Sequence, residues 1–413
     1  VLYPLDVLLA HWPTGRRIAV SAAFCLCTPA LHAQDAAHRL AQEALIFDTH
    51  IDAPGMLTEG WRDLALQTDR EFDYPKARAG GLDVAFMSIY TSPTEDAAGT
   101  AYDMANRQID SVLALAARAP DKFAVLTSPG DAERLLAGNR ILLPMGMENA
   151  APLGDNLANV AFFFERGIRY ITLAHSASNR VSDSSYSAER PWGGLSPFGR
   201  EVIGEMNRLG MMVDVSHLSD AAAAQAIELS AVPVIASHSA FRHFTPGFER
   251  NISDDLAKSL AARGGVVQIP FGTAFVNPQA AATMQAKFTE RAALHARNEK
   301  AKADGRPLED VDAWNTAWDK AHPPLDTPIT AVLDQLDYGV KLLGIDHVGI
   351  GSDFDGVGGE LPAELRTVAD FPKLVAGLRQ RGYRDADIRK ILGGNLMRAW
   401  TAIEAGAGKR HSR

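Results

Sequence analysis

Residues 211–238 read MMVDVSHLSDAAAAQAIELSAVPVIASH, and the fold can be inferred outward from this stretch. Two short apolar runs, Met211–His217 and Pro233–His238, flank a helix-forming segment, Asp220–Leu229. Short runs with β-branched residues are typical of buried strands. Ser219 stands where a helix N-cap is expected. The stretch therefore predicts a strand, a helix and a second strand, and each strand ends in a histidine.

Six further runs of the same kind occur along the chain, separated by helix-like stretches such as Ala101–Arg118 and Pro197–Leu209. These runs are Leu45–Asp52, Asp83–Tyr90, Ile141–Glu148, Ile168–His175, Gly265–Phe271 and His347–Asp353. Eight such alternations predict an α/β fold with a parallel sheet, closed into a (β/α)8 TIM barrel. The alternation by itself would also fit an open doubly wound sheet.

The polar residues at the ends of the runs favour the closed barrel. Six runs end in a histidine, aspartate or glutamate, in the segments FDTHID, MGMEN, TLAH, DVSH, ASH and GSDFD. Parallel strands of a barrel have their carboxyl ends on one face, and barrel enzymes place their chemistry there. We therefore expect these side chains to converge on one site.

Five of these residues form a candidate metal-ligand set: His50, Asp52, Glu148, His217 and His238. Each alone is as well explained by a structural histidine or a salt bridge at a strand end. Glu148 follows a run with no other charge, and a buried carboxylate is costly unless it is paired or bound to metal. Three imidazoles and two carboxylates suit zinc, with enough ligands for two ions if one carboxylate bridges them.

Three other residues are candidates for catalysis and substrate binding. Asp353 could carry a proton to a leaving amine, and Asp355 competes for this role but lies farther from the strand. His175 could donate a hydrogen bond to a carbonyl oxygen that becomes an oxyanion. Arg250 could bind a carboxylate, although a single arginine in a loop is more often a solvated surface group.

Composition excludes several classes of protein. The 413 residues contain 41 Lys and Arg against 50 Asp and Glu, a net charge of −9 that argues against a nucleic-acid partner. Cys25 and Cys27 are the two cysteines of the sequence, which excludes a cysteine-rich zinc module and a disulfide scaffold. Apolar residues make up 46%, enough for a sizeable core.

The N-terminal part of the chain resembles a secretory signal. Residues 16–33, RRIAVSAAFCLCTPALHA, combine an arginine pair, an apolar stretch and a small residue at the end. We expect residues 1–33 to be removed, leaving an exported protein, periplasmic or secreted, with no stable membrane insertion. The alternative is a buried N-terminal helix.

The remaining chain is expected to form one domain. Residues 34–405 would be the barrel, with a helical insertion at 273–327 after the seventh strand, and residues 406–413 a flexible basic tail. The insertion is predicted to be one or two solvated helices or, alternatively, a lid or a dimer contact.

From about Leu45 to Trp400 the chain resembles the membrane dipeptidases, also called renal dipeptidases, which are zinc-dependent barrel hydrolases. The matching motifs occur in order: DTHIDAP, GMENA, YITLAHSASN, GLSPFGREVIGEMNRLGMMVDVSH, PVIASHS, ERNISDD, GIGSDFDG and GGNLMRAW. One departure is PFGTAFV at 270–276, where the family has a more polar and aromatic run. This departure concerns side-chain specificity rather than the type of reaction.

The resemblance implies roles for the site residues. His50 and Asp52 would hold one zinc ion and His217 and His238 a second, bridged by Glu148, so that two Zn²⁺ bind per chain. A hydroxide bridging the ions would attack the peptide carbonyl, with Asp353 as the catalytic acid, His175 contacting the substrate and Arg250 binding its carboxylate. The substrate would be a dipeptide, and a D-residue would be tolerated at its C-terminal position.

Two other functions remain open from the sequence. One is another binuclear zinc amidohydrolase, such as a lactonase, a deaminase or a β-lactam hydrolase. Those barrels often begin with His-x-His and use a modified lysine, whereas this chain has Asp52 and Glu148. The other is a barrel that binds ligands without catalysis. A homodimer is possible in either case.

Overall fold

The computed structural model describes residues 28–408, with side chains described from residue 34 onward. Helix α1 (Thr28–Glu43) crosses the expected boundary between residues 33 and 34. Residues 1–27 of the expected signal and residues 409–413 of the expected tail lie outside the described range. Removal of the signal therefore stays a prediction. No helix within residues 28–408 is both long and apolar enough to cross a bilayer.

Eight parallel strands form the barrel. They are β1 (Ile46–Ile51), β2 (Leu82–Tyr90), β5 (Met145–Glu148), β6 (Ile168–Thr172), β7 (Met212–Asp214), β8 (Ile235–Ala236), β9 (Val266–Ile269) and β10 (Val348–Ile350), paired in this order. The ring closes between its first and last strands, where Asp52 N–H donates to Phe354 O at 2.9 Å and Asp353 N–H donates to His50 O at 3.0 Å. The predicted (β/α)8 fold is confirmed.

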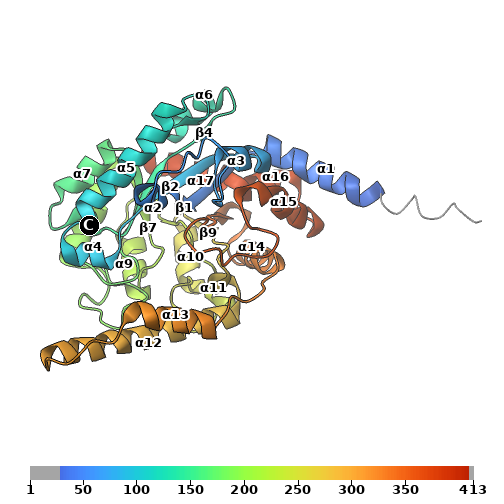
Figure 1. Cartoon of the computed structure of the whole chain (residues 1–413). Coiled ribbons are helices and arrows are strands. Elements are labelled where there is room, and N and C mark those ends of the chain that lie inside the picture. The colour runs from blue at the N-terminus through green and yellow to red at the C-terminus, as the bar shows by residue number, and fades with distance from the viewer. Residues whose placement is uncertain (1–27, 409–413) are drawn as a thin grey trace, which may run out of the picture.

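Helices surround the sheet (Figure 1). In the barrel they are α2 (Ala53–Glu59), α3 (Tyr74–Gly80), α4 (Pro93–Ala98), α5 (Ala101–Arg118), α6 (Ala132–Leu136), α7 (Ala158–Glu165), α8 (Pro197–Leu209), α9 (Asp220–Leu229), α10 (Asp254–Ala262), α14 (Thr330–Leu343), α15 (Phe371–Gln380), α16 (Asp385–Arg389) and α17 (Asn395–Ala405). The bounds of α5, α8 and α9 agree with the sequence prediction. Ser219 caps α9 as expected, because its hydroxyl accepts the N–H of Ala222 at 3.2 Å.

The sheet departs from the prediction at one run. Ile141–Glu148 was expected as one strand but forms β4 (Ile141–Leu142) and β5, separated at Pro144. Proline has no N–H to donate to a neighbouring strand, so the ladder breaks there. The strand β3 (Phe123–Ala124), which pairs with β4, was not predicted because two residues show no periodicity.

The interior of the barrel is filled at the end opposite the predicted site. Alternate residues of the strands point inward, among them Phe47, Phe86 and Tyr170, and Trp400 of α17 packs against them. The Trp400 ring lies 5.5 Å from the Phe86 ring and 6.2 Å from the Phe47 ring, measured between centroids. The interior is thus filled at this end, and the predicted site lies at the other end, at the carboxyl ends of the strands.

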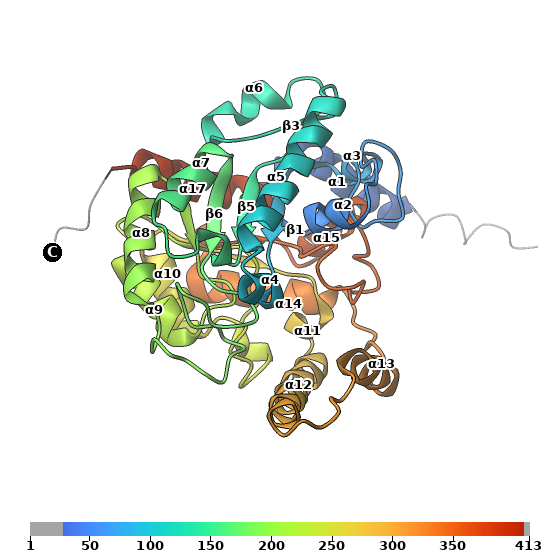
Figure 2. The same ribbon diagram turned by 60° about the vertical axis from the view of Figure 1, so that its left-hand side comes forward.

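The segment at 273–327 is helical, as predicted. It contains α11 (Thr273–Val276), α12 (Pro278–Ala303) and α13 (Val311–Ala321). Helices α12 and α13 lie side by side and project from the barrel in both views (Figures 1 and 2). Lys287 Nζ of α12 lies 2.5 Å from Asp319 Oδ1 of α13.

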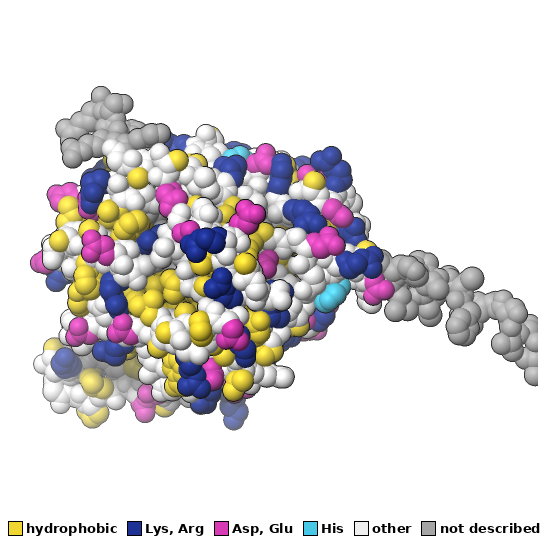
Figure 3. Space-filling model, turned by 90° about the horizontal axis from the view of Figure 1, so that it is seen from above, with side chains coloured by type: hydrophobic (Ala, Val, Ile, Leu, Met, Phe, Trp, Pro, Cys, Tyr) yellow, Lys and Arg dark blue, Asp and Glu magenta, His cyan; other side chains and the backbone are white. Residues whose placement is uncertain are grey.

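On the face of the molecule drawn in Figure 3, basic and acidic side chains are interspersed.

Candidate metal centre

The five predicted ligands lie together at the carboxyl end of the barrel. His50 is in β1, Asp52 follows it, and Glu148 is the last residue of β5. His217 and His238 lie just beyond β7 and β8 rather than within the predicted strands. His217 has φ of 67°, a left-handed conformation that is uncommon for a residue with a side chain. Such backbone strain occurs most often at functional sites.

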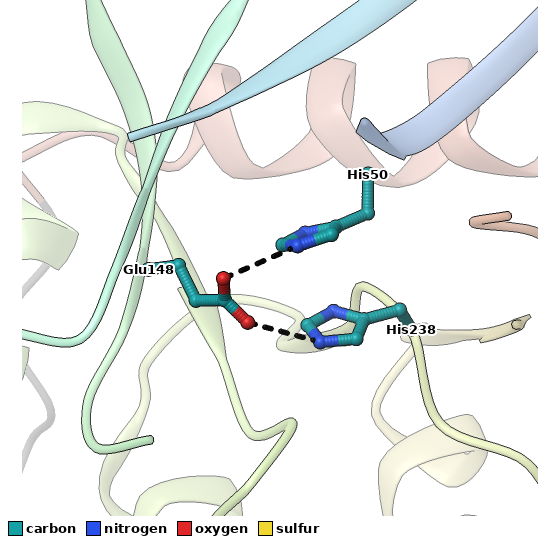
Figure 4. Close-up of side chains that lie close together, drawn as sticks. All are labelled: His50, Glu148 and His238. Atoms are coloured by element: carbon teal, nitrogen blue, oxygen red, sulfur yellow. Dashed lines mark ion pairs between the residues drawn. The ribbon is translucent and has the colours of Figure 1, made fainter. Parts of the chain in front are cut away.

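Glu148 is at the centre of the cluster (Figure 4). Its Oε2 lies 3.4 Å from His50 Nε2, and its Oε1 lies 3.2 Å from His238 Nε2 and 3.1 Å from His217 Nε2. Burial alone would raise the pKa of Glu148, but the neighbouring imidazoles, His50 first, hold it well below the usual range. One ionised carboxylate therefore faces histidines from β1 and from the loops after β7 and β8.

Hydrogen bonds behind the cluster determine which ring nitrogens face it. The Tyr170 hydroxyl donates to Thr49 O, so it can only accept from His50 Nδ1, which lies 2.8 Å away. The Ser237 hydroxyl donates to Asp214 Oδ2 and likewise accepts from His238 Nδ1 at 2.7 Å. With hydrogen on Nδ1, each ring turns its Nε2 toward the centre, and this atom offers a lone pair when the ring is neutral.

These lone pairs form a site that fits a cation. The Nε2 atoms of His217 and His238 are 2.8 Å apart, and burial lowers the pKa of both rings well below the usual value. His50 Nε2 is buried and has no hydrogen-bond partner among the described residues. Neutral imidazole nitrogens facing one another and a carboxylate are the donor set that zinc prefers. The residues present therefore fit the metal that the sequence implied.

Sequence analysis missed Tyr170 and Asp214, the residues that orient these rings. Asp214 could have been noticed, since it is a charge inside the apolar run MMVDV and is completely buried. Besides Ser237, its Oδ2 accepts the Thr172 hydroxyl at 2.6 Å. Tyr170 gave no such indication, because an aromatic residue in a strand is ordinarily core.

Asp353 lies on the other side of His50. His50, Asp52 and Asp353 each place a ligand atom within 4.8 Å of the other two. A Cβ on Gly356 would lie 2.2 Å from Asp52 Oδ2 and 2.3 Å from Asp353 Oδ1, so only glycine leaves room for both carboxylates. Burial, and then the charge of Asp52, raise the pKa of Asp353 well above the ordinary value. This carboxyl therefore holds a proton more readily than an exposed aspartate.

Asp355, the competing candidate, is engaged elsewhere. Its two oxygens accept the backbone N–H groups of Glu71 and Phe72 at 3.0 and 3.3 Å. In return, the Asp355 N–H donates to Glu71 Oε2 at 2.5 Å. Asp355 thus ties the loop after β10 to the loop before α3.

His175 and Arg250 complete the group of predicted residues. His175 Nε2 lies 3.4 Å from Glu148 Oε1. The Arg250 guanidinium is buried and donates to His238 O at 2.8 Å, with Nη2 3.1 Å from His217 Nε2. No carboxylate among residues 34–408 lies within 4.0 Å of it, although a buried cation is costly without an anion. Arg250 is therefore available to an anionic ligand.

A cavity of about 460 Å³ opens beside the cluster. Asp52, Glu148, His175, His217 and Asp353 line its floor. Its apolar lining includes Met56, Tyr186, Phe275, Met284, Phe288 and Val357. Phe275, Met284 and Phe288 belong to the insertion at 273–327, for which a lid was one of the two expectations. The cavity is the size of a small-molecule site.

Comparison with known proteins identifies the family of this chain. The sequence profile of the membrane dipeptidase family, peptidase family M19, matches residues 34–413. The chain belongs to this family. This M19 dipeptidase is therefore a metallopeptidase that hydrolyses peptide bonds, and the family is zinc-dependent.

Three proteins similar to this M19 dipeptidase are themselves named as dipeptidases or as a probable dipeptidase. Dipeptidase aclJ of Aspergillus oryzae is 29% identical over 343 residues, which cover 81% of this chain and 70% of that protein. The crystal structure of the probable dipeptidase PvdM from Pseudomonas aeruginosa is 29% identical with a TM-score of 0.78, covering 91% of this chain and all of that one. Dipeptidase AC, a metallopeptidase of family M19, is 25% identical with a TM-score of 0.70, covering 87% of this chain and 99% of that one.

Proposed function

We propose that this dipeptidase cleaves free dipeptides and that it binds two zinc ions per chain. The observation that carries the proposal is Arg250, a buried cation that has no anionic partner among residues 34–408 and lies 3.1 Å from the ring nitrogen of His217. A substrate carboxylate bound by Arg250 would lie close to the cluster. The scissile bond at the cluster can then be followed by only one residue, which excludes longer peptides.

The donor atoms suit a divided ligand set. His50 and Asp52 would hold one ion and His217 and His238 the other, with Glu148 between them. When bound, zinc supplies Lewis acidity and makes water more acidic. Asp353 would receive the proton of the attacking water and pass it to the leaving amine. His175 would donate a hydrogen bond to the carbonyl oxygen as negative charge develops on it.

The family resemblance extends the proposal to dipeptides with a D-residue at the C-terminal position. The activities of other binuclear zinc barrels, such as lactone or β-lactam hydrolysis, are the rival proposals. We further propose that the enzyme acts outside the cytoplasm, in the periplasm or after secretion, which residues 16–33 support. Assembly as a homodimer remains part of the proposal.

The purified enzyme is expected to contain about two zinc ions per chain and to hydrolyse L,L and L,D dipeptides. Metal analysis and a hydrolysis assay on both sets of substrates, a tripeptide, a lactone and a β-lactam test this directly. A chelator should abolish hydrolysis, and added zinc should restore it. Turnover of the lactone or β-lactam without dipeptide hydrolysis would replace the proposal with a rival.

Replacing Arg250 with methionine, which fills similar space without charge, should raise KM for a free dipeptide. We expect kcat/KM to fall by about 100-fold, since losing one partner of a buried ion pair costs about 2–5 kcal/mol. A dipeptide amide, which lacks the carboxylate, should lose little. Zinc content serves as the control because Arg250 contacts His217. An equal loss on the amide would contradict carboxylate binding.

A further inference from the structure

The inserted helix α12 contributes directly to the cavity of the metal centre. Met284 and Phe288 are four residues apart on α12, so they share one face of the helix, and both line the cavity. Tyr186, from the loop before α8, faces them with its ring 4.4 Å from the Phe288 ring and its hydroxyl 4.0 Å from Met284 Sδ. These three residues, here called the aromatic wall, come from segments about 100 residues apart.

The aromatic wall is only partly covered by the protein. Tyr186, Met284 and Phe288 are each half-buried where they line the cavity. Each square ångström of apolar surface removed from water contributes about 25 cal/mol. A ligand with an apolar side chain would complete their burial, whereas a charged side chain would lose its hydration there without gaining a partner.

The wall lies close to Arg250, which is itself buried and contacts two residues of the cavity lining. The Tyr186 ring is 5.9 Å from the His217 ring, and His217 contacts Arg250. The Arg250 guanidinium also lies 4.8 Å above the ring of Phe275, another cavity residue. A substrate whose carboxylate reaches Arg250 therefore has its C-terminal residue beside the wall.

The acidic residues of the cavity come from other segments. Asp52 and Glu59 follow β1, and Glu360 follows β10, whereas Arg250 follows β8. A zwitterionic dipeptide with its carboxylate at Arg250 would pair its amino group with one of the carboxylates that line the cavity. The same orientation again places the C-terminal residue against the aromatic wall.

We propose that Tyr186, Met284 and Phe288 bind the side chain of the C-terminal residue of the substrate and select apolar side chains such as leucine and phenylalanine. The proposal rests on the proposed dipeptidase function and assigns a role to the insertion that contains α12. It also gives Phe275, in the departing segment PFGTAFV, a place in the same pocket.

The test is a series of L-alanyl dipeptides that differ only in the C-terminal residue: Ala, Leu, Phe, Ser, Lys and Glu. The wild-type enzyme should show its highest kcat/KM with Leu and Phe. Phe288→Ala should lower kcat/KM for these two by about 10-fold and for Ala by less than about twofold, because a lost apolar contact costs only substrates that use it. Phe288→Leu should retain most of the preference.

Arg291→Ala, an exposed change one turn farther along α12, is the matched control and should leave the series unchanged. Thermal melting of each variant reports on folding. An equal loss on every substrate in Phe288→Ala, an unchanged preference in Phe288→Ala, or a wild-type preference for Lys or Glu would each overturn the proposal. If the wild type hydrolyses none of the series, the dipeptidase function itself fails and the wall proposal fails with it.

Discussion

Glu148→Gln is expected to remove most of the bound zinc and nearly all hydrolysis. The amide keeps the shape of the side chain but loses the charge that faces the Nε2 atoms of three histidines. Loss of an outer-shell partner costs metal sites about 10- to 100-fold, so the central ligand should cost more than about 100-fold in kcat/KM. Metal analysis and a dipeptide assay measure both effects.

The matched control for this change is Glu165→Gln, the same substitution at an exposed residue that ends α7. It should keep the zinc content and activity of the wild type. Unchanged zinc content in Glu148→Gln would show that this carboxylate is not a ligand. Full activity in Glu148→Gln would exclude the whole site as described.

Asp353→Asn should abolish turnover while zinc remains bound. Asparagine cannot transfer a proton, and general acid–base catalysis contributes about 10²- to 10⁴-fold, so kcat should fall by that factor. Hydrolysis under saturating substrate and metal analysis of the same preparation separate the two effects. Loss of zinc together with activity would instead make Asp353 a ligand, which its position within 4.8 Å of His50 and Asp52 would allow.

Asp355→Asn is the informative comparison, because Asp355 was the competing candidate. The Asp355 oxygens accept two backbone N–H groups, so Asp355→Asn should destabilise the fold. We expect a lower melting temperature and a kcat near that of the wild type. Near-normal kcat in Asp353→Asn together with a large loss in Asp355→Asn would reverse the assignment.

Much of the fold could be predicted because its determinants are local. Helices such as Pro197–Leu209 and Asp220–Leu229 show their apolar spacing and their serine caps within a few residues. The strand ends were less accurate: His175, His217 and His238 lie beyond β6, β7 and β8, in the connecting loops. The pattern of apolar residues indicates which residues are buried. Because residues in these loops are buried like those in the strands, the pattern could not show where each strand ends.

The sequence could predict which residues form the candidate site, but it could not predict how their side chains are oriented. Parallel strands place their carboxyl ends together, so position in the chain was enough to group His50, Glu148, His217 and His238. The ring orientations depend on Tyr170 and on Asp214 acting through Ser237. These contacts join residues on different strands. A single sequence does not show which side chains on neighbouring strands will contact each other.

The sequence by itself determined the barrel, the set of reactive residues and their common face, because hydrophobic period and strand direction are properties of the chain. Only the tertiary structure decided which nitrogen of His50 and His238 faces the centre, and that Met284 and Phe288 meet Tyr186. It also decided that Arg250 is buried with no anion beside it in the described part of the chain. Those features depend on how different segments pack together, for example His50 against Tyr170, 120 residues away, and Tyr186 against Met284, 98 residues away. Hydrogen bonds and close packing require particular distances, and these are set only when the segments are assembled.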